Sequence, residues 1–283
     1  MVLKIIKNEK NQKLSKLVQD SLGVGFNKIQ KLIRNKDIKI DGVRISKDVE
    51  LTKGNTVEIY IKENPLKIVF ENNDIVVVFK PRNLETISEN NGDDLVCRLS
   101  NQIGVNLFAV HRLDRNTEGL VVFAKNEKAK KSLDMAIKQR CLEKFYLAKA
   151  VGIPEKQEDN LVAFLKKDET KSIVIISDKK QVGFEEIRTN YKLVEKYDEF
   201  SILEVELVTG KTHQIRAHLS HIGYPILGDE KYGNSEINKI NKKKYQCLCA
   251  YKLIFHFEAN DYLYNLNGVV VELDKKEIDF LKI

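Results

Sequence analysis

The segment of the sequence with the clearest chemical potential places one carboxylate between two guanidinium groups. In the run His111–Leu120, Asp114 follows Arg112 by two residues and directly precedes Arg115. An Asp flanked by arginines usually forms a structural ion pair, but positive neighbours also favour the ionised carboxylate over the protonated one. An ionised carboxylate serves as a nucleophile or as a charge stabiliser and cannot donate a proton. Asp114 is therefore a candidate for either of these two roles.

Other residue patterns that suggest metal or phosphate chemistry are incomplete. His213, His218 and His221 lie close together, but no acidic or cysteine ligand stands at a matching spacing, so we expect ordinary helix histidines or histidines that face a ligand rather than a metal site. Gly210–Thr212 has the residues that end a phosphate-binding loop, yet Val205 stands where that motif requires its first glycine. The sequence therefore predicts no metal and no nucleotide cofactor.

The residues around these candidates alternate between apolar and polar types, a period of two that is typical of β-strands. The polar run ending at Leu120 leads directly into the apolar segment Val121–Ala124. The pattern predicts strands over 68–70, 75–80, 121–124, 145–151, 172–176, 186–194, 201–208 and 249–257, and helices over 127–140, 212–222 and 275–282. Many strands, few helices and no regular strand–helix alternation predict an α+β fold on a mixed or antiparallel sheet.

Length and composition limit the number of domains. The 283 residues are 42% hydrophobic and 31% charged, which is near the average of globular proteins and allows a sizeable core. This length suits one large domain together with a small one. Because Pro65 marks a short linker near Glu63–Leu66, we predict a small domain over residues 1–64 and a larger one over residues 65–283.

The cysteines and the apolar runs bear on the location of the protein. Four scattered cysteines lack the spacing of a disulfide framework or a zinc motif, which is typical of reduced thiols in an intracellular protein. No apolar run approaches the roughly 20 residues of a membrane helix, and Met1–Lys10 carries charges where a signal peptide needs an apolar stretch. We therefore expect a cytoplasmic protein that does not enter a membrane.

Positive charge is concentrated in the first quarter of the chain. Residues 1–64 contain 14 Lys and Arg against 8 Asp and Glu, whereas the remaining residues contain 34 and 33. Apolar residues at helical spacing predict two short helices, and the second presents Lys28, Lys31 and Arg34 on its polar side at three-residue steps. A lysine-rich proteome alone can produce such an excess, but its concentration in one segment favours a surface that binds a polyanion.

The segment from about residue 12 to residue 62 resembles a known RNA-binding domain. After the two helices, Ile38–Ile40, the Asp41-Gly42 turn and Val43–Ile45 predict a tight hairpin, and Thr56–Ile61 predicts a further strand. This order of elements resembles the alpha-L domain first described in a small-subunit ribosomal protein. The resemblance implies structured RNA as the ligand, because such a surface contacts the shape of the backbone rather than base edges.

The larger predicted domain resembles the RluA-type pseudouridine synthases. The run His111–Leu120 is similar to the catalytic motif of that family, and other stretches agree with it in order and approximate spacing. Before it, Ile68–Pro81 resembles the opening hairpin that ends in Lys-Pro; after it come Glu143–Tyr146 and then Leu207–Gly233, which contains TGKTHQIRAHL. An alpha-L domain joined to such a catalytic domain resembles the branch that modifies large-subunit ribosomal RNA.

The resemblance implies an isomerisation that needs no cofactor. These enzymes convert uridine within RNA to pseudouridine by cleaving the bond from base nitrogen to sugar, rotating the base and rejoining it through carbon. Asp114 would be the nucleophile and would attack either the uracil ring or the sugar carbon, two routes between which the sequence does not choose. Arg216 would pair with Asp114 and keep it ionised. Tyr146 would stack on the target base and act as general base.

The resemblance also implies residues that hold the RNA. Arg112 corresponds to a side chain that fills the gap left when the uridine swings out of its stack, which would offset part of a cost of a few kcal/mol. Lys144 and His111 are candidates for contacts with phosphate or for support of the catalytic loop.

We therefore predict a two-domain, monomeric RNA pseudouridine synthase that acts on ribosomal RNA, with the 23S RNA of the large subunit as the expected substrate. Two alternatives stay open at this point. One is a pseudouridine synthase of transfer RNA, and the other is a noncatalytic RNA-binding factor in ribosome assembly that keeps the same fold. The presence of Asp114, Tyr146 and Arg216 argues against the noncatalytic alternative, whereas only a substrate assay separates the two RNA classes.

Overall fold

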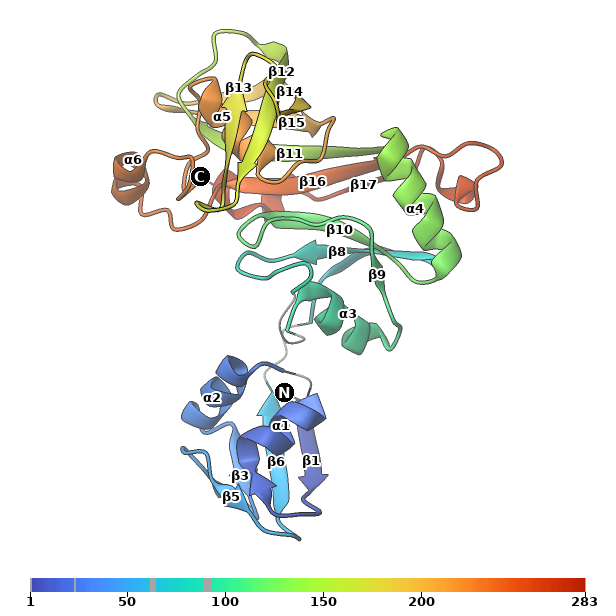
Figure 1. The fold of residues 1–283 in the computed structure, drawn as a ribbon, viewed down its shortest axis with the longest axis vertical. Helices are drawn as coiled ribbons and strands as arrows, with labels where there is room; N and C mark the ends of the chain where they lie inside the picture. Colours follow the sequence, from blue (N-terminus) through green and yellow to red (C-terminus); the bar gives the residue numbers. More distant parts are fainter. Residues whose placement is uncertain (1, 23, 62–64, 89–92, 283) are drawn as a thin grey trace. The chain divides into compact units, whose positions relative to one another are not determined.

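The structure, a computed structural model, describes residues 2–22, 24–61, 65–88 and 93–282 (Figure 1). The chain divides into two compact units, each made of two separate segments of the sequence. The first unit comprises Met1–Leu66 and Ile87–Gly104, and the second comprises Lys67–Thr86 and Val105–Ile283. The predicted linker at Glu63–Leu66 lies partly outside the described residues, and the predicted domain boundary at residue 64 stays a prediction.

The first unit contains a four-stranded antiparallel sheet in the order β1-β6-β3-β4. Its core includes buried residues from two helices and from the sheet, among them Leu17, Ile29 and Ile59. The two helices and the hairpin predicted from the sequence are confirmed, whereas the pattern does not predict β1, in which two lysines interrupt the apolar residues. The elements are β1 (Val2–Lys7), β2 (Gln12–Lys13), α1 (Leu14–Leu22), α2 (Phe26–Arg34), β3 (Ile38–Ile40), β4 (Val43–Arg44), β5 (Glu50–Leu51), β6 (Thr56–Ile61) and α3 (Leu95–Ile103).

The second unit is built on one sheet of eleven strands, which confirms the predicted α+β class. The strands follow the order β13-β12-β14-β15-β11-β16-β10-β8-β7, with β17 beside β16 and β9 beside β10. The sheet is mixed, because β10 and β16 run parallel while β10 and β8 run antiparallel. The strands are β7 (Ile68–Glu71), β8 (Ile75–Lys80), β9 (Phe108–Ala109), β10 (Glu118–Ala124), β11 (Leu142–Val151), β12 (Glu158–Asp168), β13 (Ile173–Ser177), β14 (Glu185–Lys196), β15 (Phe200–Leu207), β16 (Leu248–Phe255) and β17 (Val270–Glu272).

Each predicted strand of the second unit overlaps an observed one, but the sequence pattern does not predict β12. In this strand the apolar residues form one continuous run, Leu161–Leu165, between polar and charged ends, and such a run fits a buried helical segment as well as a strand. The strand matters to the architecture because β12 pairs with both β13 and β14 and extends the sheet beyond β15.

The second unit contains the helices α4, α5 and α6. Helix α4 (Glu127–Gln139) begins at Asn126, whose side chain accepts the backbone N–H of Ala129, and it buries Leu133 in the main core. Helix α5 (Gln214–His221) is short and almost wholly buried, and helix α6 (Ser235–Ile240) follows it. None of the helices among residues 2–22, 24–61, 65–88 and 93–282 is long and apolar enough to cross a membrane.

The helix predicted over residues 275–282 is wrong. The structure has two 3₁₀ turns there, η2 (Lys275–Glu277) and η3 (Asp279–Leu281), because Ile278 between them has extended backbone angles. Ile278 and Phe280 are buried in the core of the second unit. Burial of these two side chains thus takes precedence over the helical propensity of the lysines around them.

Gly119 in β10 allows the two parallel strands to approach closely. Its φ of 123° lies in the region that favours glycine, and a Cβ placed on it would lie 2.2 Å from the carbonyl oxygen of Ala250 in β16. The contact joins the two strands at the point where the run from His111 enters the sheet. No other residue type fits this backbone approach without displacing one of the strands.

We expect Gly119→Ala to lower the free energy of unfolding by roughly 3 kcal/mol or more, because the added Cβ overpacks the strand pair and is strained at positive φ. Chemical denaturation of the purified variant measures the loss. Gly268→Ala is the matched control, since Gly268 also has positive φ but no described atom lies within 4 Å of its Cβ position. The control should lose only about 1 kcal/mol, and equal losses in the two variants would refute the packing argument.

Candidate active site

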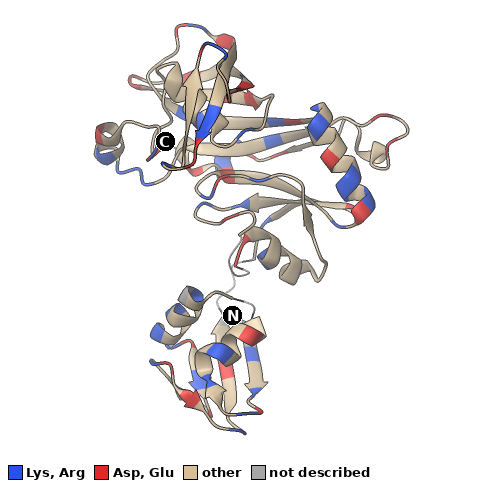
Figure 2. Ribbon diagram, in the orientation of Figure 1, with Lys and Arg blue, Asp and Glu red and all other residues tan. Residues whose placement is uncertain are grey.

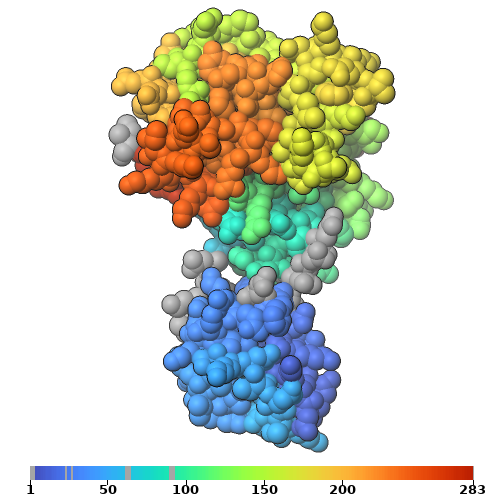
Figure 3. Space-filling model, turned by 60° about the vertical axis from the view of Figure 1, so that its left-hand side comes forward, coloured from blue at the N-terminus to red at the C-terminus, as the bar shows by residue number. Residues whose placement is uncertain are grey.

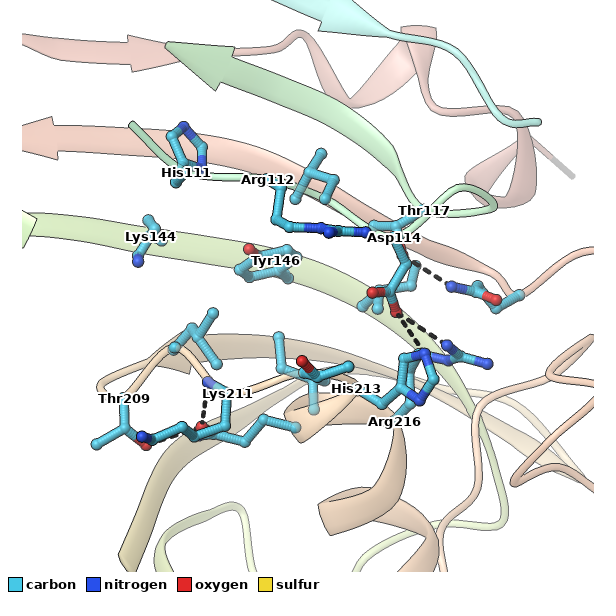
Figure 4. Close-up of a pocket in the computed structure, with 18 of the residues that line it drawn as sticks. His111, Arg112, Asp114, Thr117, Lys144, Tyr146, Thr209, Lys211, His213 and Arg216 are labelled. Carbon is cyan, nitrogen blue, oxygen red and sulfur yellow. Dashed lines mark hydrogen bonds and ion pairs between the residues drawn. The ribbon is translucent and has the colours of Figure 1, made fainter. Parts of the chain in front are cut away.

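A cavity of about 810 Å³ opens in the second unit (Figure 4). Its walls come from the loop that precedes β10, from β11, from the loop between β15 and α5, and from residues just before and after α6. These segments are far apart in the sequence, and the sheet brings them together. The cavity is lined by every site residue predicted for the larger domain: His111, Arg112, Asp114, Lys144, Tyr146 and Arg216.

The centre of the cavity contains a guanidinium group between two carboxylates. Arg216 Nη1 of α5 donates to Asp114 Oδ2 at 2.9 Å (Figure 4). On its other side Arg216 binds Asp229 in a bidentate manner, with Nε 2.6 Å from Oδ2 and Nη2 2.8 Å from Oδ1. The Asp229 side chain is fully buried, whereas the Asp114 side chain is 24% exposed. Asp114 is thus the carboxylate of the pair that a ligand in the cavity can reach.

The charges of this arrangement support one another. Burial by itself would lower the pKa of Arg216, but the hydrogen bonds and charges of Asp229 and Asp114 outweigh it and raise that pKa above its usual range. Burial would likewise raise the pKa of Asp229, yet Arg216 and the backbone N–H groups of Tyr232 and Lys231 lower it overall. Arg216 is therefore permanently charged and Asp229 is ionised at neutral pH.

Buried polar side chains fix the loop that carries Asp114. Lys80 is fully buried at the end of β8, and its Nζ donates to the carbonyl oxygens of Leu84 at 2.8 Å and Arg115 at 3.1 Å. Burial lowers the pKa of Lys80 to about 8 against the opposing charges of Asp114 and Glu118. The lysine of the Lys-Pro pair is thus an internal brace of the loop.

Further hydrogen bonds hold both sides of the same loop. The hydroxyl of Thr86 accepts the N–H of Leu113 at 3.1 Å and donates to its carbonyl oxygen at 3.2 Å. After Asp114, the Thr117 hydroxyl accepts a hydrogen bond of 2.7 Å from the buried Gln246 side chain. The carboxylate therefore projects from a loop whose backbone is fixed before and after it.

Tyr146 lies on the floor of the cavity and is 5% exposed. Its hydroxyl makes no hydrogen bond to any residue that the structure describes. Burial, followed by the charge of Asp114, raises the pKa of Tyr146 well above its usual range. The hydroxyl is therefore protonated at neutral pH, and the ring presents an apolar surface to a ligand.

Two further side chains, His213 and Tyr232, lie beside Asp114. His213 Nε2 is 3.9 Å from Asp114 Oδ2, and its Nδ1 is 2.9 Å from the Tyr232 hydroxyl. That hydroxyl also accepts the backbone N–H of Val174 at 2.7 Å, and its own hydrogen is available for donation to Nδ1. In the tautomer with this donation, the ring hydrogen of neutral His213 lies on Nε2, facing Asp114. Burial lowers the pKa of His213, which favours this neutral form.

The remaining predicted residues of the cavity differ in how they are held. Arg112 is exposed at the cavity. Lys144 has no hydrogen-bond or ion-pair partner among the described residues, and burial lowers its pKa. His111 Nε2 accepts the backbone N–H of Val122 at 3.0 Å, while burial and the charge of Lys144 lower the pKa of His111 to about 3. His111 is thus a neutral support of the loop, and Lys144 is the better placed of the two to contact an anion.

The predicted RNA-binding residues Lys28, Lys31 and Arg34 lie on α2 in the first unit, on the side opposite buried Ile29 and Ile33. Lys31 and Arg34 are exposed. Lys28 Nζ lies 2.9 Å from Asp93 Oδ1, so part of its charge is balanced within the protein.

His213, His218 and His221 each have a different hydrogen-bond or ion-pair partner. His218 and His221 lie on α5. His218 is buried and its Nδ1 lies 3.0 Å from the Thr189 hydroxyl. Burial, with a smaller contribution from His221, lowers the pKa of His218 to about 4. His221 meets Asp178 at the surface at 2.8 Å. Among the residues that the structure describes, no three potential ligands gather in a metal-binding arrangement.

Sequence reasoning did not single out Asp229, Tyr232, Lys80 or Gln246 as site residues. Asp229 and Tyr232 lie inside the stretch Leu207–Gly233, but no local pattern distinguishes an acid that binds an arginine 13 residues earlier. Gln246 contacts a threonine 129 residues away. The one available signal was Lys80, a lysine that ends an apolar strand and precedes a proline.

The segment that builds most of the cavity matches a known protein family. Residues 74–221 match the RNA pseudouridylate synthases, which is about half of the chain. This chain belongs to that family. It is accordingly an isomerase that acts on uridine in RNA, as the resemblance of the sequence motifs implies.

Individual relatives of this pseudouridine synthase cover nearly the whole chain. A ribosomal large subunit pseudouridine synthase C of Buchnera aphidicola is 29% identical over 93% of this chain and 89% of its own length. An uncharacterized RNA pseudouridine synthase of Mycoplasma capricolum is 32% identical over 94% and 95% of the two chains. The human RNA pseudouridylate synthase domain containing 1 has the same fold, with a TM-score of 0.64 and 23% identity over 77% of this chain and 86% of its own.

The low pKa of His218 predicts a dependence of stability on pH. The unfolded chain binds a proton at this residue near pH 6.5, whereas the folded chain does so only near pH 4. The stability that neutral His218 contributes is therefore present above pH 6.5 and is lost as the pH falls toward 4. The slope should be on the order of 1 kcal/mol per pH unit.

The measurement is the free energy of unfolding at pH 7 and pH 5 for the parent enzyme and His218→Gln. The destabilisation caused by the substitution should shrink at pH 5, because only the parent enzyme gains a proton on unfolding there. His221→Gln on the same helix controls for general effects of replacing a histidine. A destabilisation by His218→Gln that is the same at both pH values would rule out a neutral buried His218.

Proposed function

We propose that this pseudouridine synthase modifies ribosomal RNA of the large subunit, with Asp114 as the nucleophile of a covalent mechanism. The observation that carries the proposal is the ion pair between Asp114 and Arg216, at 2.9 Å in a cavity large enough for a nucleoside. The choice of ribosomal RNA is supported by the relatives named as large subunit pseudouridine synthases. Transfer RNA is the alternative substrate, and the direct comparison of the two RNAs separates them.

The reaction breaks the bond between N1 of uracil and C1′ of ribose and forms a bond between C5 and C1′. One proton leaves C5 and one proton is gained at N1, so no atom is gained or lost overall. In the proposed mechanism the ionised Asp114 attacks the ring or C1′ and holds one fragment covalently while the base rotates. Arg216 orients the attacking oxygen through a charge-assisted hydrogen bond.

Tyr146 is proposed to stack on the target base and to take part in removing the proton from C5. A buried ring on the cavity floor provides the apolar face for stacking. Because its phenol is protonated at neutral pH, it can accept the C5 proton only if it gives up its own proton in the same step, and N1, which gains one proton in the reaction, is the acceptor that the overall balance supplies. The transfer follows formation of the C5–C1′ bond, when loss of the C5 proton restores the conjugated uracil ring.

The polar groups around the opening are proposed to hold the RNA. Arg112 is exposed at the cavity and is proposed to occupy the space left by the flipped uridine. Lys144 is proposed to contact a phosphate, and His111 supports the loop beside it.

We also propose an alpha-L RNA-binding domain over residues 1–64, in which Lys31 and Arg34 contact the RNA backbone, and a catalytic domain over residues 65–283. A monomer in the cytoplasm stays our expectation.

Asp114→Asn should abolish release of tritium from uridine labelled at C5 of ribosomal RNA. The substitution keeps the shape of the side chain but removes the charge and the nucleophile. RNA affinity should stay within roughly tenfold, about 1.4 kcal/mol. Glu230→Gln, which removes another carboxylate that lines the cavity, is the control and should remain active. Full activity of Asp114→Asn would remove this residue from the mechanism.

Lys31→Gln together with Arg34→Gln should weaken RNA binding and flatten its dependence on salt. Each lost phosphate contact reduces the slope of log affinity against log salt by about 0.7 to 0.9, so the pair should reduce it by between one and two. The double variant Lys47→Gln and Lys53→Gln removes two exposed charges of the same unit outside α2 and serves as control. If both double variants show the same salt slope, the α2 residues do not contact RNA.

A further inference from the structure

A short surface segment beside the cavity carries four lysines and is distinct from the residues discussed above. We propose that this segment, residues 239–245 at the end of α6 and in the loop that follows, here called the lysine loop, binds the phosphate backbone of the RNA strand that enters the cavity. The proposal rests on the proposed function in that it takes RNA as the substrate. Figure 2 shows the positive charges on α6 and on the loop that follows it.

The charge of the lysine loop is not balanced by the protein. Lys239, Lys242, Lys243 and Lys244 are all exposed, and none of them has a carboxylate within 4 Å among the residues that the structure describes. The carboxylate of Asp279 binds Lys282 at 2.7 Å, and the charge of Lys243 makes only a smaller contribution to lowering the pKa of Asp279. Exposed lysines without internal partners are the groups that release bound counterions when they neutralise phosphates.

The loop borders the cavity directly. Gly228 lines the cavity, and a Cβ placed on it would lie 2.1 Å from the carbonyl oxygen of Tyr245 and 3.2 Å from Lys243 Cβ. Gln246, the next residue along the chain, also lines the cavity and holds Thr117 of the Asp114 loop. Figure 3 shows this orange segment of the chain at the molecular surface. A strand with one nucleotide in the cavity therefore has its neighbouring phosphates within the region of these lysines.

Hydrogen bonds of the buried Asn238 connect the lysine loop to residues beside the cavity. The buried Asn238 accepts the N–H of Gly228 at 2.7 Å and donates to the carbonyl oxygen of Asp229 at 3.0 Å. The carbonyl oxygen of Asn238 in turn accepts the N–H of Lys243 at 3.0 Å. Because the side chain of Asp229 binds Arg216, two residues separate the backbone of the lysine loop from the guanidinium that holds Asp114. The backbone of the lysine loop thus has a defined position relative to Asp114.

The loop also offers apolar contacts that suit a nucleic acid. Tyr245 is 37% exposed and Ile240 is 78% exposed, next to the lysines. An exposed aromatic ring among cations is the combination on which unpaired bases stack, and such stacking tolerates any base. Single-stranded RNA flanking the target uridine fits these features better than an acidic protein, because the loop lies at the opening that the target nucleotide must enter.

The experiment uses the full-length enzyme with Lys242, Lys243 and Lys244 all replaced by Gln. We expect KM for ribosomal RNA to rise about tenfold with kcat within twofold, and the salt slope of RNA binding to become shallower by about two. Substituting the same three lysines by Arg should restore both values, because charge rather than the amine is required. The control variant replaces Lys179, Lys180 and Lys192, which are exposed and do not line the cavity.

The outcomes distinguish this proposal from the proposed function. If the Gln variant and the control variant have the same KM and the same salt slope, the lysine loop does not bind RNA. If the parent enzyme modifies transfer RNA instead of ribosomal RNA, the proposed substrate is wrong, and the salt slope for transfer RNA then tests the loop in the same way. An unchanged RNA affinity combined with loss of binding to an acidic protein in the variant would overturn the proposal in favour of a protein partner.

Discussion

The position of one guanidinium group, that of Arg216, governs the geometry of the site. It is 7% exposed and its N–H groups are shared between a fully buried carboxylate and one that faces the cavity. A buried arginine is stable only if its charge is matched, and Asp229 supplies that match through two parallel hydrogen bonds. Removing Asp229 would therefore leave the buried charge paired with Asp114 alone and release the guanidinium from the position in which it orients Asp114. The loop before β10, helix α5 and the turn after α5 must therefore lie together, because each carries one of these three side chains.

Buried polar contacts, and not apolar packing alone, fix α5 against the sheet. The side chain of Gln214, at the start of α5, donates to the carbonyl oxygen of Arg188 and to the hydroxyl of Thr189, both on β14. His218, one turn later, contacts the same threonine. These bonds fix the rotation of a helix of only eight residues, which would not hold its direction by its own hydrogen bonds. Arg216 lies between the two anchors and so has little freedom to move.

Of the bonds at the cavity, the sequence predicted the pair of Asp114 with Arg216 but not the contacts that support it. The resemblance of short motifs placed Asp114, Tyr146 and Arg216 together, and the structure brings all three to one cavity. Asp229 could not be predicted, because pairing with Arg216 depends on the turn that follows α5 and not on any repeating pattern. The hydrogen bond from Lys80 to the Asp114 loop could not be predicted either, because it joins the end of β8 to a residue 35 positions later in the chain.

The fold was predicted to a similar extent. In the second unit most strands were recognised, including the continuous apolar runs of β8 and β10, whereas β12 and the short strands β9 and β17 were not. The helix predicted near the C-terminus was wrong because the burial of Ile278 and Phe280 decides the backbone there. Local patterns thus predict the class and most elements, whereas tertiary contacts decide the exceptions.

The charge balance of the central triad explains how the protein holds a carboxylate firmly without neutralising it. Asp114, Arg216 and Asp229 together carry two negative charges and one positive charge. Because Asp229 occupies two N–H groups of the guanidinium, the contact with Asp114 is a single hydrogen bond to Oδ2. That bond orients the carboxylate, while Asp229 offsets much of the positive charge that would otherwise lower the reactivity of Asp114 in its proposed role as nucleophile. The exposed cations around the cavity can then attract the phosphates of an RNA without neutralising the carboxylate that is proposed to react.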